Sequence, residues 1–131
     1  MIHMKTKNIL LIVLTISLLQ LSFITHGNHG CEEASNYAKM IISDVDIILE
    51  NNDLVNTKIK KYKNIGSKFK SSRYYANKCN CHQAYALAKE GEQYAKSLIT
   101  IKESHLLHEH LKHIQAISEG IIIYASSCEN D

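Results

Sequence analysis

The stretch CHQAYALAKEGEQYAKSLI, residues 81–99, decides the fold. Its small and apolar residues recur every three or four positions, at Ala84, Leu87, Ala88, Gly91, Tyr94, Ala95 and Leu98. This spacing predicts a helix that buries one face. Followed in both directions, the pattern predicts a long helix from about Arg73 to Ile101.

Three further amphipathic helices are expected on either side of it. The first covers residues 32–50, and the second follows Asp53, a candidate cap, and weakens at Gly66. The residues KSS, 70–72, are expected to connect it to the long helix, with Ser72 as the next N-cap. The last runs from Ser104 to about Ser126. Because the chain has no proline and short connections, we expect an all-α, up-and-down four-helix bundle.

The N-terminal segment resembles a secretory signal peptide. Lys5 and Lys7 precede an apolar run at 9–24, and small residues follow at Thr25 and Gly27. A membrane anchor is the alternative, but this run is shorter than the roughly 20 residues needed to span a bilayer. We therefore expect cleavage after about residue 27, one bundle domain at 28–131, an extracellular location and no membrane association after cleavage.

Four cysteines, at positions 31, 79, 81 and 128, follow the expected cleavage site. In a secreted domain they are expected to form disulfides. Cys81 and Cys128 fall at the same end of antiparallel helices, so a bridge between them is natural, and Cys31 could join Cys79. The sequence leaves other pairings open.

Basic residues are concentrated in one block. Removal of Lys5 and Lys7 would leave 13 basic against 13 acidic residues, yet no acid lies between Asp53 and Glu90. The candidate binding residues in this interval are Lys58, Lys60, Lys61, Lys63, Lys68, Lys70, Arg73 and Lys78, followed by Lys89. The block could hold an acidic protein surface or an acidic polysaccharide, or it could be a solvated helix face. Nucleic acid is not expected, because no binding motif is present.

The stretch HLLHEHLKH, residues 105–113, raises the question of a metal site. A zinc protease requires H-E-x-x-H, but position 112 is Lys and the next histidine is His113. His108 and His113 therefore diverge by about 140° on a helix. His105, Glu109 and His113 do lie in one row on the helix, but no other helix is identified that would supply further metal ligands. We expect a solvated face that gains positive charge toward pH ~6, and no metal.

The pattern of nucleophiles and glycines does not indicate catalysis. There is no nucleophile elbow or glycine-rich phosphate loop, and CNC at 79–81 lacks the C-x-x-C spacing of a redox pair. We expect neither an enzyme nor a cofactor. Packing is the preferred interpretation of the tyrosines at 62, 74, 75, 85, 94 and 124.

Three short motifs resemble the plant invertase and pectin methylesterase inhibitor family. CHQAYALA places Tyr85 and Ala88 four and seven residues after Cys81, SSCEND resembles the later cysteine motif at Cys128, and CEEASNYAKM places Tyr37 six residues after Cys31. The resemblance implies a secreted helical bundle that inhibits a cell-wall carbohydrate-active enzyme, with Cys81 bridged to Cys128.

The chain departs from this family in three ways. Met40 stands where the family has its second cysteine, so Cys79 is expected to take Cys31. The family's further helix after the later cysteine motif is absent, so the bundle must expose apolar surface, cover it by homodimerisation or recruit its first helix. The family's Pro-Lys-Phe segment that meets invertase cannot occur without proline, which favours pectin methylesterase as the target.

Two alternatives to inhibition stay open. One is a secreted helical protein that carries a small ligand or acts as a signal. The other is an inhibitor-like fold that has lost inhibitory activity.

Overall fold

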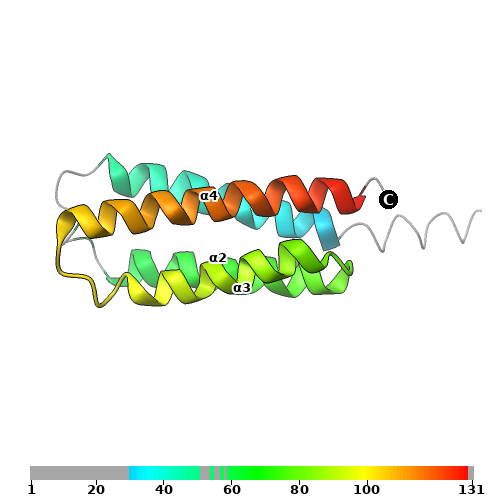
Figure 1. Ribbon diagram of the computed structural model, residues 1–131, viewed down its shortest axis with the longest axis horizontal. Coiled ribbons are helices and arrows are strands. Elements are labelled where there is room, and N and C mark those ends of the chain that lie inside the picture. The colour runs from blue at the N-terminus through cyan, green and yellow to red at the C-terminus, as the bar shows by residue number, and fades with distance from the viewer. Residues whose placement is uncertain (1–29, 51–53, 55–56, 58, 130–131) are drawn as a thin grey trace, which may run out of the picture.

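The computed structural model describes residues 30–50, 54, 57 and 59–129, and within them the chain is all-helical. A first helix at residues 30–49 is followed by α2 (Ile59–Lys78), α3 (His82–Ser97) and α4 (Ser104–Glu129). Successive helices run in opposite directions along one axis, with the first helix and α4 above α2 and α3 in Figure 1. The predicted up-and-down four-helix bundle is confirmed. The expected signal peptide, the expected cap Asp53 and Lys58 lie outside the described residues.

Every helix contributes one apolar stripe to a common core, as the spacing predicted. The first helix buries small and branched residues, and α2 supplies the largest ring, Phe69. The buried side chains of the first helix are Cys31, Ala34, Ser35, Ala38, Ile41, Val45 and Ile48. The first helix therefore takes a full place in the bundle. No helix among the described residues is both long and apolar enough to cross a membrane.

The predicted boundary between the second and third helices is wrong. Ser72, expected as an N-cap, lies inside α2 with no exposed surface, and its hydroxyl donates to the Ala34 carbonyl at 2.9 Å. Because the Ser72 side chain points into the core and its hydroxyl is bonded there, it does not end the helix. The buried stripe of α2 continues to Ala76. Arg73 accordingly belongs to α2, and α3 ends at Ser97, short of the expected Ile101.

The actual break is the turn Cys79-Asn80-Cys81. Asn80 has φ of 59°, the left-handed conformation that asparagine tolerates better than most residues. The Cys81 amide donates to the Ala76 carbonyl at 2.9 Å and the Asn80 amide to the Asn77 carbonyl at 3.1 Å. This pair of bonds is the Schellman motif that ends helices and satisfies their last carbonyls. Asn80 therefore ends α2 in the place that glycine more often takes.

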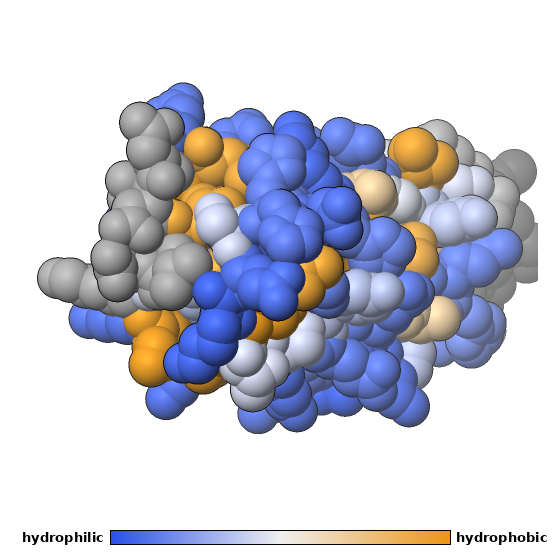
Figure 2. All heavy atoms as spheres, turned by 60° about the vertical axis from the view of Figure 1, so that its left-hand side comes forward, coloured by the Kyte–Doolittle hydropathy of each residue, from blue (hydrophilic) through white to orange (hydrophobic). Residues whose placement is uncertain are grey.

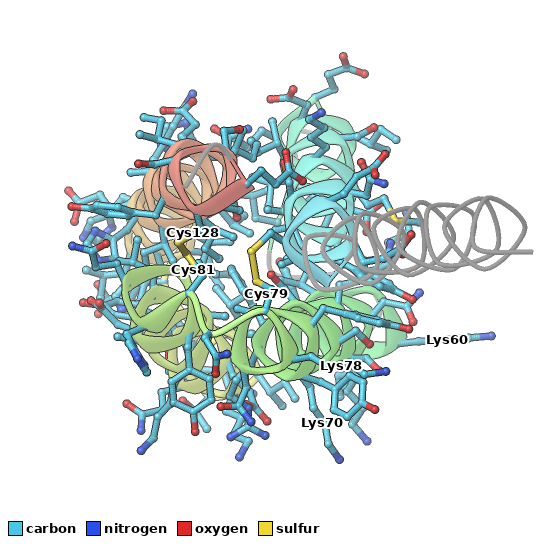
Figure 3. All side chains as sticks on the ribbon, turned by 90° about the vertical axis from the view of Figure 1, so that its right-hand side faces the viewer. Lys60, Lys70, Lys78, Cys79, Cys81 and Cys128 are labelled. Atoms are coloured by element: carbon cyan, nitrogen blue, oxygen red, sulfur yellow. A yellow bond between two sulfur atoms is a disulfide. The ribbon has the colours of Figure 1, made fainter. Side chains whose placement is uncertain are left out.

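Two disulfides meet at this turn, with the pairing that was favoured from the sequence. Cys31 is bonded to Cys79 and Cys81 to Cys128, so all four helices are joined at one end of the bundle (Figure 3). The sulfur atoms of Cys31, Cys81 and Cys128 lie within 4.8 Å of one another. With sequence separations of 48 and 47 residues, each bridge stabilises the fold by about 4 kcal/mol in the chain-entropy model.

Polar contacts tie the first helix to its neighbours. Lys68 of α2 forms an ion pair with Asp44, and the Gln115 amide of α4 donates to Asp46 at 2.5 Å. The Tyr62 hydroxyl of α2 donates to the Leu54 carbonyl at 2.8 Å, which holds Leu54 against α2. The orientation of α2 is therefore fixed along its length.

Two helical glycines give a matched test of the α2–α3 packing. A Cβ on Gly91 would overlap the ring of Phe69, which is fully buried and cannot swing aside, whereas a Cβ on Gly66 would lie 3.6 Å from the Ala95 Cβ. We expect Gly91→Ala to lower the free energy of unfolding by about 1–3 kcal/mol through overpacking. Gly66→Ala should raise it by up to about 1 kcal/mol, because alanine favours the helix. Urea denaturation measures both, and equal effects would contradict the described approach of α3 to α2.

Two buried serines test the contact between α2 and the first helix. Ser72 bonds across to Ala34, whereas Ser118 bonds to Ile114 within α4, both at 2.9 Å. We expect Ser72→Ala to cost about 1 kcal/mol of stability, since an interhelical hydrogen bond is lost. Ser118→Ala should cost less, because its partner carbonyl belongs to its own helix. Thermal unfolding of the two variants measures the difference, and a smaller loss for Ser72→Ala would be evidence against this helix contact.

Candidate interaction surface

The fold divides the predicted basic residues that the structure describes into three groups. Lys68 pairs with Asp44, and the Arg73 Nε atom lies 3.3 Å from a carboxylate oxygen of Glu92 on α3. These two side chains are only partly exposed and serve contacts between helices. Lys61 lines a small groove of about 210 Å³ between the first helix and α2, beside Asp44 and Ile47.

The remaining lysines form what we call the basic face of α2, namely Lys60, Lys63, Lys70 and Lys78, all exposed. At about 100° per residue they fall within an arc of about 80°, opposite the buried stripe, and they extend over about 27 Å of helix. Figure 3 shows Lys60, Lys70 and Lys78 pointing away from the bundle. The 20 residues of α2 include no Asp or Glu, so no acidic side chain of the same helix neutralises the lysines of this face.

An aromatic row crosses the C-terminal end of this face. Tyr74 is 58% exposed, which differs from the packing role expected from the sequence. The Lys78 ammonium lies 5.6 Å from the Tyr74 ring centroid, a cation–π contact. Tyr74 meets Tyr75 edge to face at 5.1 Å, and Tyr75 stacks on Tyr37 of the first helix at 5.9 Å. Tyrosine is enriched at protein–protein interfaces, and these ring contacts fix the position of the exposed Tyr74.

A groove between α2 and α3, of about 290 Å³, borders the basic face. We call it the α2–α3 groove. Its lining residues are Tyr62, Lys63, Gly66, Ser67, Lys70, Glu92, Ala95, Lys96 and Ile99. Lys96 was not predicted, because it lies on another helix and beyond the acid-free block. Only the packing of α3 against α2 brings it beside Lys63 and Lys70.

The rest of the visible surface is mostly polar. On the face in Figure 2, hydrophilic side chains cover most of the bundle and hydrophobic ones gather in small separate groups. Among the described residues visible on this face, polar side chains therefore separate the hydrophobic groups from one another. The exposed apolar residues Ile47 and Ile123 lie on different helices.

The histidines of α4 do not gather around one point. His105 lies 3.4 Å from Glu103, whereas His113 lies 3.7 Å from Glu90 of α3 and packs on the Tyr94 ring. The His110 Nδ1 atom lies 2.9 Å from the Leu106 carbonyl oxygen. Within residues 30–50 and 59–129, the one convergent group of three or more potential metal ligands is Cys31, Cys81 and Cys128. These sulfurs are already bonded in disulfides.

Comparisons with known proteins do not assign this chain to a family. No family model, no curated protein and no solved structure matches it.

The basic face predicts binding to polyanions that depends on position as well as on net charge. We expect the Lys70→Glu/Lys78→Glu variant to elute from immobilised polygalacturonate at lower salt than the wild type. The control Lys39→Glu/Lys112→Glu makes the same change in net charge on exposed positions of the first helix and α4. The salt concentration at which this control elutes should change less, because charges more than a Debye length of about 8 Å from the bound polyanion are screened. Equal shifts would show that net charge alone governs retention.

Proposed function

We propose that this protein is a secreted, non-catalytic inhibitor of a cell-wall carbohydrate-active enzyme, with pectin methylesterase a better candidate than invertase. The observation that carries the proposal is the Cys81–Cys128 bridge inside a helical bundle. It joins the two cysteines that the family resemblance pairs. Ala88, the last residue of the first motif, is fully buried, and Tyr85 packs against the core.

The departures from the family are compatible with this proposal. Cys31, which lacks a cysteine partner at Met40, is bonded to Cys79, and Met40 is exposed on the first helix. The first helix fills the bundle with its own apolar stripe. The fold therefore stays closed without the family's usual N-terminal disulfide. Absence of any proline still argues against the invertase-binding segment, which leaves pectin methylesterase favoured.

The proposed mechanism is occlusion of the target's active-site cleft by a rigid helical face. The basic face of α2 would steer the inhibitor toward an acidic surface and so raise the association rate. Tyr74, exposed beside Lys78, is suited to supply a buried anchor at the contact, because aromatic side chains dominate the energetics of many interfaces. A rigid bundle stapled at one end would lose little entropy on binding.

A ligand carrier is less well supported by the grooves. Small-molecule sites usually enclose about 300–1,000 Å³. The two grooves measure about 290 and 210 Å³ and lie between helices at the surface. Grooves of this volume fit a single side chain of a partner better than a small molecule that the protein would carry.

Inhibition is tested with protein produced through a secretory host and purified in its oxidised, thiol-free form. We expect stoichiometric loss of pectin methylesterase activity at mildly acidic pH and a smaller effect, or none, on acid invertase. The Lys70→Glu/Lys78→Glu variant should inhibit more weakly than Lys39→Glu/Lys112→Glu, since only the first pair alters the basic face. Full activity of both enzymes in the presence of excess folded wild-type protein would refute the proposal.

A further inference from the structure

We propose that the α2–α3 groove is a docking site for one large apolar side chain of a protein partner, in a segment that carries acidic residues on either side. This rests on the proposed function, because it names the chemistry of the contact on the partner. The groove borders the basic face and shares Lys63 and Lys70 with it. A partner that covers one therefore also meets the other.

The floor of the groove is apolar and open because of Gly66. Tyr62, Ala95 and Ile99 supply aromatic and aliphatic surface, and Gly66 adds no side chain. A methyl group on Gly66 would already be in van der Waals contact with Ala95, at 3.6 Å. The space above Gly66 is thus a notch between two helices. Its volume of about 290 Å³ falls just below that of small-molecule pockets, which fits a single side chain.

The rim of the groove is positively charged. Lys63, Lys70 and Lys96 stand around the floor, from both helices. Glu92 is the carboxylate in the lining, but it is 15% exposed and pairs with Arg73. Its charge is therefore largely compensated, whereas the lysines can reach carboxylates on a partner. Their aliphatic stems extend the apolar walls.

The groove is formed before any partner binds. The Tyr62 ring is almost fully buried, and its hydroxyl is held by the Leu54 carbonyl at 2.8 Å. Burial raises the pKa of Tyr62, so its hydroxyl stays neutral. Ala95 and Gly66 are held by their helices. An anchor that enters this site finds its walls in place, which reduces the entropic cost of binding.

The test uses a fluorescein-labelled peptide, Glu-Asp-Phe-Glu-Asp, with the oxidised protein and anisotropy as the readout. We expect the peptide to bind, its Phe→Ala version to bind about tenfold more weakly or worse, and both affinities to fall with salt. Backbone amide shifts in NMR should locate the Phe peptide at Gly66, Ser67 and Ala95.

Two substitutions of Gly66 distinguish a loss of peptide binding caused by filling the groove from one caused by a change in fold. Gly66→Leu should fill the notch and weaken binding of the Phe peptide about tenfold or more, whereas Gly66→Ala, which adds one methyl group in ordinary contact with Ala95, should weaken it clearly less. Lys63→Glu/Lys96→Glu should also weaken binding, and Lys39→Glu/Lys112→Glu should weaken it less. Circular dichroism of each variant checks that the bundle is intact.

Three outcomes would overturn the inference: no measurable peptide binding, equal affinity of the Phe and Ala peptides, or wild-type affinity in folded Gly66→Leu. Equal displacement of the Phe and Ala peptides by polygalacturonate would assign the surface to polysaccharide instead. Peptide binding without enzyme inhibition would contradict only the proposed function. Inhibition that survives Gly66→Leu unchanged would contradict only the groove as the anchor.

Discussion

The turn at Cys79-Asn80-Cys81 is the constraint on which the rest of the structure depends. Asn80 adopts the left-handed conformation that ends α2, and the cysteines on either side bond to the first helix and to α4. One residue of chain thus separates the two covalent links that join all four helices. A chain of this size buries a modest core, so links that restrict the unfolded state contribute much of its stability.

The turn also determines what α2 presents to solvent. With its C-terminal end tied to the first helix through Cys79, α2 is kept in register by the Ser72 bond to Ala34 and by Phe69 against Gly91. The opposite side of the helix must then face outward, and that side carries Lys60, Lys63, Lys70 and Lys78 (Figure 3). The basic face and the α2–α3 groove are therefore consequences of how the core is built. Binding to a partner would use surface that the fold already holds rigid.

Periodicity was enough to predict the bundle and its core stripes, because apolar residues at helical spacing dominate this sequence, but it left the disulfide pairing open. It failed at Ser72, where a residue that usually caps helices satisfies its hydroxyl inside the core. A signal for the true break was present in the asparagine between the two cysteines, a residue able to adopt positive φ. The groove could not be predicted, because Lys96 and Gly66 meet only through tertiary packing.

Disulfide mapping of the oxidised protein, purified from a secretory host, is the most direct test of the structure, because the orientation of α2 depends on the pairing. Partial reduction, cyanylation and mass spectrometry distinguish bonds to Cys79 from bonds to Cys81 despite the single residue between them. We expect Cys31 joined to Cys79 and Cys81 to Cys128, with no free thiol. Either of the other two pairings, Cys31 with Cys81 and Cys79 with Cys128, or Cys31 with Cys128 and Cys79 with Cys81, would contradict the structure, because the turn would no longer link α2 to the first helix and α3 to α4 as described.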